Sequence, residues 1–370
     1  MPSRAAGRLR IAPRALARRF LRMQRRERPA APRRILVAHH LLLGDTLMLT
    51  PLLAKLRMLH RDAEIVMTVQ RTIAPLYAGR PYGVEAIAYE PRDSRTLDAL
   101  LDGGGFDLAI VPGDNRYAWL AAAAGARWIV AHDGDRPGFK SWPVDERKPF
   151  PRLPTAWGDA VAQLADGPPP QAYRPTDWPA PHWAPFHAPA GDYCVIHVGA
   201  GTPLRRWSPE RWLAVAEELA RRGMEVVWSA GRGEESEVGA ADSLGRFRSY
   251  AGKLDLPQLW HLVKGARLFL SGDTGVAHLG RVVGTPAVTL YGPGSPRLFG
   301  PGEFWRDSPC RTVATDPFPC RDQRVIFKRE IEWVRRCQRT LAECPAPRCL
   351  HSIGITDVTR AAQELLELPR

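Results

Sequence analysis

The sequence has no long apolar run. No stretch of about eighteen consecutive apolar residues occurs in its 370 residues, so no helix is expected to span a bilayer. The amino-terminal segment also lacks the apolar centre of a secretory signal peptide. Aromatic residues interleaved with basic ones on strands are missing, as is a recognition-helix pattern, so nucleic-acid binding is not expected. Hydrophobic residues still make up 45% of the chain, which is enough to bury two cores.

Acidic residues are almost absent from the first part of the chain. Residues 1–34 hold twelve arginines and one acidic residue, Glu27, a local net charge of +11 within a total of +13. Leu16, Phe20 and Met23 recur at helical spacing among these arginines. That spacing is typical of an amphipathic helix on an anionic lipid surface. The same composition is also typical of a disordered leader. A cytoplasmic protein is expected in both cases, and the helix would place it on the inner face of the cytoplasmic membrane.

Paired cysteine motifs are missing as well. Of the six cysteines, Cys194 lies in an apolar strand and is expected to be a small buried hydrophobe. The others have irregular spacing and form no C-x-x-C pair, which favours a packed group of reduced thiols over a zinc site. These five are Cys310, Cys320, Cys337, Cys344 and Cys349.

Segments expected to be strands and helices alternate along the chain. Apolar strands at 34–38 and 64–69 flank a helix expected over 46–60, and the same order restarts at 193–198. Such alternation builds a parallel sheet covered on both faces, so the fold class is α/β with two Rossmann-like domains. A proline-rich stretch, which cannot form a regular hydrogen-bond ladder, separates the halves. The expected segments are an Arg-rich tail (1–33), a first domain (34–165), a linker (166–191), a second domain with the Cys-rich segment (192–355) and a last helix (356–370).

Three loops of the second half follow expected strands, where parallel sheets bind ligands. In the first, Gly199-Ala200-Gly201-Thr202, glycines allow backbone amides to approach a phosphate. Arg205 or Arg206, just beyond it, can neutralise the phosphate charge. The second loop, from Ser229 to Glu235, offers a carboxylate for ribose hydroxyls, although acidic residues also favour a helix N-terminus.

The third loop, Ser271-Gly272-Asp273-Thr274-Gly275, joins a strand to a helix expected over 274–283. Free amides at such a junction favour an anion. Thr274 adds a hydroxyl donor, and Asp273 is a candidate helix cap. His278 lies about one turn into the helix and faces either a ligand or the core. Three anion-compatible loops in one half predict that a diphosphate binds there.

In the first half, Gly44-Asp45-Thr46 follows the first expected strand. Asp45 has two interpretations, which are compatible: an N-cap of the next helix, or a general base that deprotonates an acceptor hydroxyl. His39, Gly44 and Thr46 are expected on the acceptor side of the site.

Four segments together resemble glycosyltransferase family 9, the bacterial heptosyltransferases of lipopolysaccharide core assembly. They lie at 35–53, 197–212, 271–279 and 284–293. The most specific is the run Asp-Thr-Gly-x-x-His that begins at Asp273, followed by Gly-Thr-Pro and Tyr-Gly-Pro. The resemblance implies a GT-B fold, with acceptor and donor domains facing across a cleft and the last helix crossing back onto the first domain.

The resemblance also implies an inverting, metal-independent transfer with no cofactor. The family's best-known donor is ADP-heptose, and its usual acceptor is a lipid-linked lipopolysaccharide saccharide. The catalytic aspartate of the family matches Asp45, and its phosphate-neutralising lysine matches Arg205. The remaining donor-binding positions are Gly199, Gly201, Thr202, Glu234, Asp273, Thr274, Gly275 and His278.

The implied partners are the nucleotide-sugar, the lipid-linked acceptor and, through the tail, an anionic inner-membrane surface. Two other interpretations of the same motifs stay open. A nucleotide-sugar 2-epimerase of GT-B fold needs no acceptor, and a non-catalytic subunit would bind nucleotide-sugar without turnover.

Overall fold

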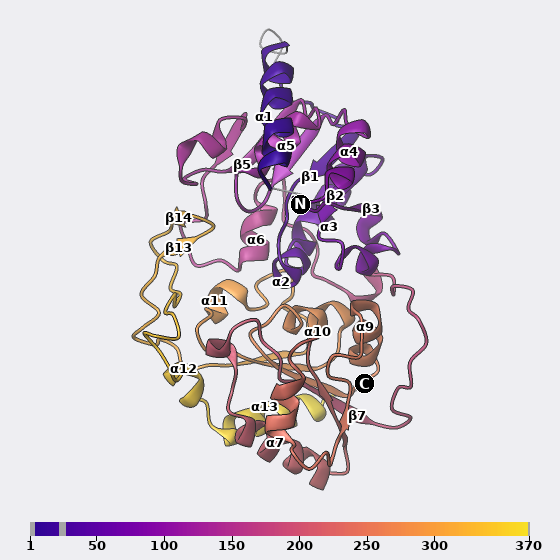
Figure 1. Ribbon diagram of the computed structural model, residues 1–370, viewed down its shortest axis with the longest axis vertical. Coiled ribbons are helices and arrows are strands. Elements are labelled where there is room, and N and C mark those ends of the chain that lie inside the picture. Colours follow the sequence, from indigo (N-terminus) through magenta and orange to yellow (C-terminus); the bar gives the residue numbers. More distant parts are fainter. Residues whose placement is uncertain (1–3, 22–26, 369–370) are drawn as a thin grey trace. The chain divides into compact units, whose positions relative to one another are not determined.

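The computed structural model describes residues 4–21 and 27–368, which belong to two compact units (Figure 1). Unit 1 comprises the chain up to residue 171 together with 324–334, and unit 2 comprises 172–323 and 335 onward. Each unit is built on a six-stranded sheet. Within the described ranges, no helix has both the length and the apolar character needed to cross a membrane.

The sheet of unit 1 has the order β3-β2-β1-β4-β5-β6, and every neighbouring pair is parallel. Its central strands are buried on both faces because helices cover both sides, so they are apolar runs rather than alternating ones. The strands are β1 (Arg34–Val37), β2 (Glu64–Val69), β3 (Val84–Ala88), β4 (Leu108–Val111), β5 (Trp128–His132) and β6 (Glu146–Lys148).

The α-helices of unit 1 are α1 (Arg4–Leu21), α2 (Leu43–Leu47), α3 (Thr50–Leu59), α4 (Ser94–Asp102), α5 (Tyr117–Ala123) and α6 (Trp157–Ala162). The 3₁₀ turns are Ala74–Tyr77, Pro81–Gly83 and Gly138–Ser141. The one helix expected over 46–60 is thus two, α2 and α3, joined at Met48 and Leu49.

The sheet of unit 2 has the order β12-β11-β10-β7-β8-β9, again with parallel neighbours throughout. Its strands are β7 (Tyr193–His197), β8 (Glu225–Ser229), β9 (Arg248–Ser249), β10 (Leu268–Gly272), β11 (Ala287–Leu290) and β12 (Cys310–Val313). Its helices are α7 (Pro209–Arg221), α8 (Glu235–Ala241), α9 (Leu256–Lys264), α10 (Ala277–Val283), α11 (Pro296–Phe299), α12 (Arg348–His351) and α13 (Ile355–Leu366), with 3₁₀ turns at Pro175–Asp177 and Pro203–Arg205.

The two sheets share one topology. If the strands of each unit are counted in chain order, both sheets read 3-2-1-4-5-6. In this order the chain reverses direction across the sheet between the first and fourth strands, which are β1 and β4 in unit 1, and β7 and β10 in unit 2. Ligands of such sheets bind beyond the carboxyl ends of those strands.

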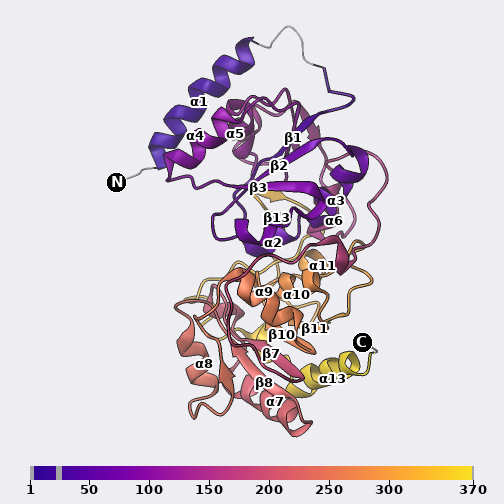
Figure 2. The same cartoon turned by 90° about the vertical axis from the view of Figure 1, so that its right-hand side faces the viewer.

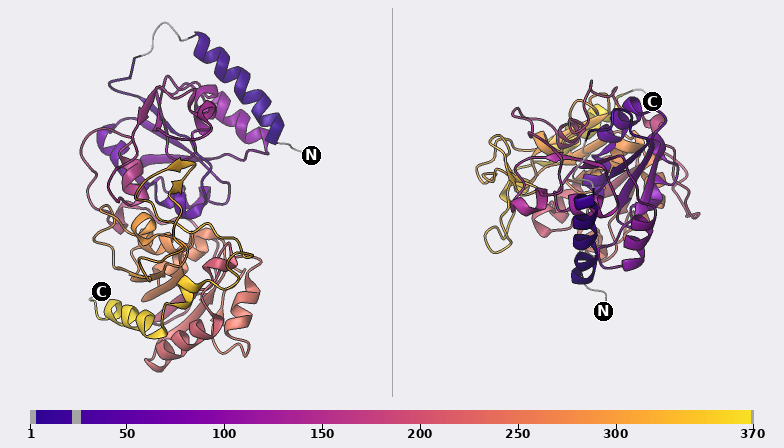
Figure 3. Two further views of the ribbon diagram at one scale, coloured as in Figure 1. Left: turned by 90° about the vertical axis from the view of Figure 1, so that its left-hand side faces the viewer. Right: turned by 90° about the horizontal axis from the view of Figure 1, so that it is seen from above.

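The amino-terminal segment forms α1, which packs against α5 and belongs to unit 1 (indigo in Figure 3). Ala15 is fully buried in the core of unit 1, next to the alanine-rich face of α5. Small side chains on both helices allow this close approach. The interpretation as a disordered leader is therefore wrong for residues 4–21, whereas Met23 lies outside the described residues.

The last helix, which the resemblance leads us to expect on the first domain, belongs to unit 2. Val358, Ala362 and Leu365 of α13 are buried in the core of unit 2, where α13 packs against α7 and the strands β10 to β12 (Figure 2). The segment that joins unit 1 is instead the hairpin of β13 (Val325–Ile326) and β14 (Arg329–Glu330). The boundary between the two units falls after residue 171, within the expected linker, so 172–191 belongs to unit 2.

Candidate functional site

The strand ends of unit 2 bring together two loops that the sequence analysis selected. Arg205, after β7, donates from its guanidinium to the Asp273 carbonyl at 3.0 Å, and the Asp273 carboxylate lies 3.6 Å from the same nitrogen. Arg206 points elsewhere, because its guanidinium forms an ion pair with Glu237 at 2.6 Å. Arg205 is therefore the arginine that lies beside the Asp273 loop.

Asp273 is a buried carboxyl within a group of cations. Burial raises its pKa, and the positive charges of Arg205, Arg281, Arg336 and Arg321 partly offset that effect. Gly294 is needed beside it, since a β-carbon there would collide with the Asp273 carboxylate.

Three buried polar atoms at the end of β10 have no hydrogen-bond partner within the described chain: Ser271 Oγ, Asp273 Oδ2 and Thr274 Oγ1. Each such atom costs about 1–3 kcal/mol when it stays unpaired. Because all three belong to the same loop, that cost is offset if a polar ligand binds there and supplies the missing bonds.

The helix after this loop begins at Ala277, three residues later than expected. Residues 273–276 are thus loop, and Asp273 makes no helix cap. His278 is buried, with its Nδ1 3.3 Å from an Arg281 nitrogen, and burial lowers its pKa well below the usual value. Arg281 in turn donates to the Tyr291 hydroxyl and the Phe299 carbonyl. His278 is therefore a neutral imidazole that belongs to a buried hydrogen-bond network inside unit 2.

Glu234 lies at the third strand end of this edge. Its carboxylate accepts a hydrogen bond from the Gly231 amide at 2.9 Å and would collide with any β-carbon on Gly199. The adjacent Glu235 instead accepts from the Gly233 amide on the exposed side. A side chain at Gly199 would therefore displace the Glu234 carboxylate, whereas Gly201 is exposed with open space around it. Thr202 is half-buried just before the 3₁₀ turn that carries Arg205.

In unit 1 the loop after β1 is held by His39 and Thr46, both fully buried. His39 exchanges backbone hydrogen bonds with the Thr68 hydroxyl, and its Nδ1 accepts from the Leu41 amide. Burial lowers the pKa of His39 to about 3, so its ring is neutral. Thr46 donates to the Leu41 carbonyl. These two residues, which are expected on the acceptor side, hold the conformation of the loop after β1.

Asp45 lies in the first turn of α2 and is half-buried. The helix begins two residues earlier, and Leu42 is its N-cap residue. The N-cap interpretation of Asp45 is thus wrong, because the residue has helical rather than capping geometry. Its negative charge still suits the amino-terminal turn. Gly44 beside it is buried.

A hollow of about 650 Å³ at the carboxyl edge of the unit 1 sheet was not anticipated. Two tyrosines, a tryptophan and a phenylalanine contribute to its walls, and His40 is the member that belongs to the loop after β1. Its lining includes Ile11, His40, Tyr89, Arg116, Tyr117, Trp119, Phe139 and Lys140. In the sequence, several of these residues follow expected strands, which is where ligands bind. Aromatic residues are equally common in cores, so their position alone does not predict a hollow.

The Cys-rich segment contains free thiols. Burial and the neighbouring Cys337 raise the pKa of Cys320. Within 4–21 and 27–368, no three or more His, Cys, Asp or Glu side chains are grouped so that they could hold a metal ion.

Comparison with known proteins places these features in context. The family model for glycosyltransferase family 9 (heptosyltransferase) matches residues 95–326. Lipopolysaccharide heptosyltransferase 3 of Escherichia coli is 25% identical over 311 residues, which cover 76% of this chain and 89% of that protein.

Two solved structures resemble the chain over 90% of its length. E. coli ADP-heptose LPS heptosyltransferase II has a TM-score of 0.67 at 17% identity and is covered to 98%. An E. coli heptosyltransferase solved with ADP-2-deoxy-2-fluoro heptose has a TM-score of 0.64 at 16% identity and is covered to 99%. Together with the two Rossmann-like sheets, these structures confirm the expected GT-B fold.

Proposed function

Because this chain belongs to glycosyltransferase family 9, we propose that it transfers a heptose from ADP-heptose to a saccharide of the lipopolysaccharide core or a related surface glycan. The observation that carries the proposal is the loop after β10, where Ser271, Asp273 and Thr274 hold buried polar atoms without partners beside the Arg205 guanidinium. Relatives named for this reaction, and one solved with an ADP-heptose analogue, support the choice of donor.

The donor diphosphate binds between the loops after β7 and β10. Arg205 neutralises part of its charge, and the Thr274 hydroxyl and the amides of 199–202 donate hydrogen bonds to its oxygens. Glu234, at the end of β8, accepts from the ribose hydroxyls. This assignment uses Glu234 rather than Glu235 because the Glu234 carboxylate lies against Gly199, at the inner side of the loop.

Transfer is a direct displacement with inversion at the anomeric carbon. Asp45 takes the proton from an acceptor hydroxyl while that oxygen forms the new glycosidic bond. The bond from the anomeric carbon to the diphosphate breaks at the same time, and its electron pair leaves on the diphosphate. Arg205 and the loop amides stabilise this growing negative charge, the role that a divalent cation has in other transferases. The reaction is therefore proposed to need no metal ion.

The acceptor binds to unit 1 in the aromatic hollow. Trp119 and the exposed Phe139 offer flat apolar faces on which sugar rings can stack, and His40 adds a polar group on the side of the Asp45 loop. Such a mixture of aromatic walls with a few polar groups is typical of small-molecule sites.

We further propose that α1 holds the protein on an anionic membrane surface. Leu9, Leu16 and Phe20 lie on one side of α1 and are exposed at 75%, 46% and 76%. Replacement of Leu16 and Phe20 by Gln is expected to abolish flotation with phosphatidylglycerol vesicles, whereas Leu153→Gln, at another exposed leucine of unit 1, keeps it. Equal flotation of all three proteins contradicts the membrane role.

The experiment that tests the function is a thermal-shift panel followed by a transfer assay. ADP is expected to stabilise the full chain more than UDP, GDP or CDP at equal concentration. ADP-heptose with a heptose-deficient lipopolysaccharide acceptor is then expected to yield a heptosylated product. Donor epimerised without acceptor would establish an epimerase instead, and donor binding without any product would establish a binding subunit.

A further inference from the structure

The hairpin of residues 324–334 brings chain from the Cys-rich segment into unit 1. Its two strands pair in register, Val325 with Glu330 and Ile326 with Arg329. The turn residues Phe327 and Lys328 both have positive φ, 44° and 64°. Neither is a glycine or asparagine, so this turn carries backbone strain that surrounding contacts must offset.

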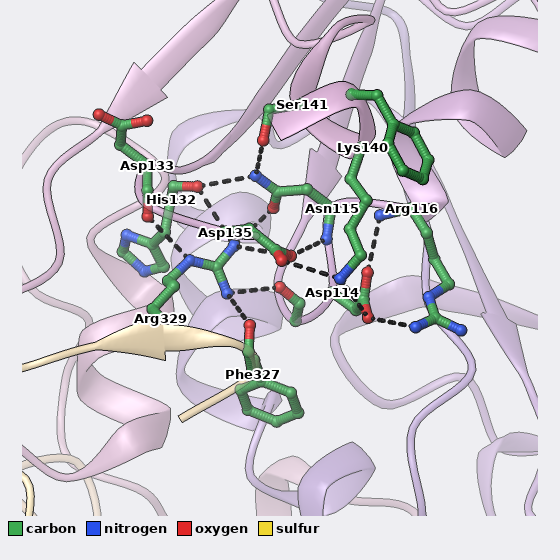
Figure 4. Close-up of polar contacts among 12 residues, drawn as sticks. Asp114, Asn115, Arg116, His132, Asp133, Asp135, Lys140, Ser141, Phe327 and Arg329 are labelled. Atoms are coloured by element: carbon green, nitrogen blue, oxygen red, sulfur yellow. Dashed lines mark hydrogen bonds and ion pairs between the residues drawn. The ribbon is translucent and has the colours of Figure 1, made fainter. Parts of the chain in front are cut away.

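Arg329 provides those contacts. Its side chain is buried to 2% exposure and donates to the carbonyls of Gly113, His132 and Asp133 and to the Asn115 side-chain oxygen (Figure 4). These acceptors belong to the loops after β4 and β5. One arginine thus fixes the hairpin to both loops at the carboxyl edge of the unit 1 sheet.

Asp135 and Lys140 extend the same network. The Asp135 carboxylate accepts from the backbone N–H of Asn115 at 2.7 Å and from Lys140 at 2.9 Å, and it lies 3.7 Å from Arg329. Lys140 also contacts Asp114 at 3.1 Å, and Asp114 pairs with Arg116 at 2.8 Å. The loops therefore have fixed positions, with their buried charges paired.

Beside this network lies a second hollow, of about 950 Å³, with a basic lining. This volume is within the range of about 300–1,000 Å³ that is typical of small-molecule sites. Five of its lining residues are basic and two are acidic: Arg116, Arg136, Lys140, Arg147 and Lys328, against Asp133 and Asp135. It shares Arg116, Pro137 and Lys140 with the aromatic hollow, so the two adjoin.

The basic residues that line this hollow differ in whether their charge is paired with a carboxylate. Arg116 and Lys140 have carboxylate partners, as described above. Arg136, Arg147 and Lys328 are exposed, and none of them forms an ion pair with a carboxylate of the described chain. Arg147 donates only to the Ser141 carbonyl, at 3.3 Å. Three cations without carboxylate partners thus surround one hollow, and the hairpin supplies Lys328 from its turn.

We infer that this hollow binds a phosphorylated saccharide, with its phosphate on Arg136, Arg147 and Lys328 and a sugar ring toward the aromatic hollow. The inference rests on the proposed function in that such a saccharide would be part of the acceptor. Arginine and lysine side chains suit phosphate oxygens. Their backbone positions are already set by the loops and by β6, so the ordering cost on binding is confined to the side chains.

The test measures binding of glucose 1,6-bisphosphate to the full chain by titration calorimetry, with glucose and inorganic phosphate as comparison ligands. Lys328→Asn removes the charge while it keeps the turn, because asparagine tolerates positive φ. The dissociation constant is expected to rise about two- to fivefold in this variant and about tenfold when Arg147→Gln is added. Glucose is expected not to bind, and inorganic phosphate to bind more weakly than the sugar bisphosphate.

Two matched variants locate the binding. Arg61→Gln removes an exposed charge from unit 1 just before β2, at the opposite edge of the sheet, and Arg205→Gln removes the cation of the donor loops. Both are expected to leave the affinity for glucose 1,6-bisphosphate unchanged. An unchanged dissociation constant in folded Lys328→Asn with Arg147→Gln would overturn the inference, as would an equal loss in Arg61→Gln or Arg205→Gln. If ADP fails to stabilise the chain but the charge effects hold, the proposed function fails and the anion site stands.

Discussion

The loops that follow β10 in unit 2 and those that follow β4 and β5 in unit 1 occupy equivalent edges of sheets with the same strand order. Their polar groups are satisfied in different ways. In unit 2, Ser271, Asp273 and Thr274 each have a buried polar atom without a hydrogen bond in the described chain. In unit 1, Asn115 and Asp135 are bonded on several sides by Arg329, Lys140 and Ser141.

This difference indicates that the loops at the carboxyl edges of the two sheets would contribute to ligand binding in different ways. Unpaired buried groups cost stability until a ligand supplies the bonds, so the unit 2 loops gain most from a bound polar ligand, which we propose is the donor. Around Arg329, the unit 1 loops have their charged groups paired within the described chain, and the buried ring nitrogens of His132 are the polar atoms there without a hydrogen bond. The contribution of these loops is to hold side chains such as Arg116 and Lys140 in fixed positions beforehand.

The Cys-rich segment supports both edges through two buried arginines. Arg321 donates to the carbonyls of Tyr291 and Gly292 in unit 2. Arg329, eight positions later, donates to carbonyls of Gly113, His132 and Asp133 in unit 1. A segment outside the nucleotide-binding motifs therefore determines loop positions in each unit.

The largest expected effect is on the reaction, through Asp45. Asp45→Asn keeps the shape of the side chain but removes the base, so the transfer rate is expected to fall about a hundred- to ten-thousand-fold. The ADP-dependent thermal shift is expected to stay, because the donor loops belong to unit 2. The measurement is single-turnover transfer with saturating donor. Near-normal turnover would remove Asp45 from its role as the base.

The next effect is on the stability of unit 1, through Arg329. Arg329→Met leaves Asp135 with one cation fewer and several carbonyls unpaired, which is expected to cost unit 1 about 3 kcal/mol or more. Hydrogen exchange resolves the units, so the amides of β4 and β5 are expected to lose protection while those of β10 and β11 keep it. The neighbouring Lys328→Asn is the control and is expected to leave both unchanged. Equal loss in both units would mean that the two edges are not independent.

Much of this arrangement was predictable from the sequence. The central strands of both sheets are apolar runs, and the motif residues Arg205, Glu234 and Asp273 lie at strand ends in unit 2 as expected. Strand–helix alternation determines both features, because parallel strands place their carboxyl ends on one edge.

Other features had no readable local signal. The turn of the 324–334 hairpin is Phe327-Lys328, without the glycine or asparagine that marks such turns. Arg329 looks like a surface residue in a charged stretch, yet it is buried by loops more than 190 residues earlier. The helix α1 was read from Leu16 and Phe20, but the face that it buries is the one with Ala15. Long-range packing decides all three.

After the effects of Asp45→Asn and Arg329→Met, a smaller effect is expected on donor affinity, through Arg205. Arg205→Gln removes one charge-assisted contact to the diphosphate, so the dissociation constant for ADP is expected to rise about ten- to a hundredfold. The effect on stability without nucleotide is expected to be small, because Arg205 is one of four cations that offset the buried Asp273. Arg206→Gln is the matched control, since its partner is Glu237. Arg205→Lys keeps the charge but not the fork geometry and is expected to be intermediate. If Arg206→Gln weakens ADP binding as much as Arg205→Gln does, the assignment of Arg205 as the phosphate-binding arginine is contradicted.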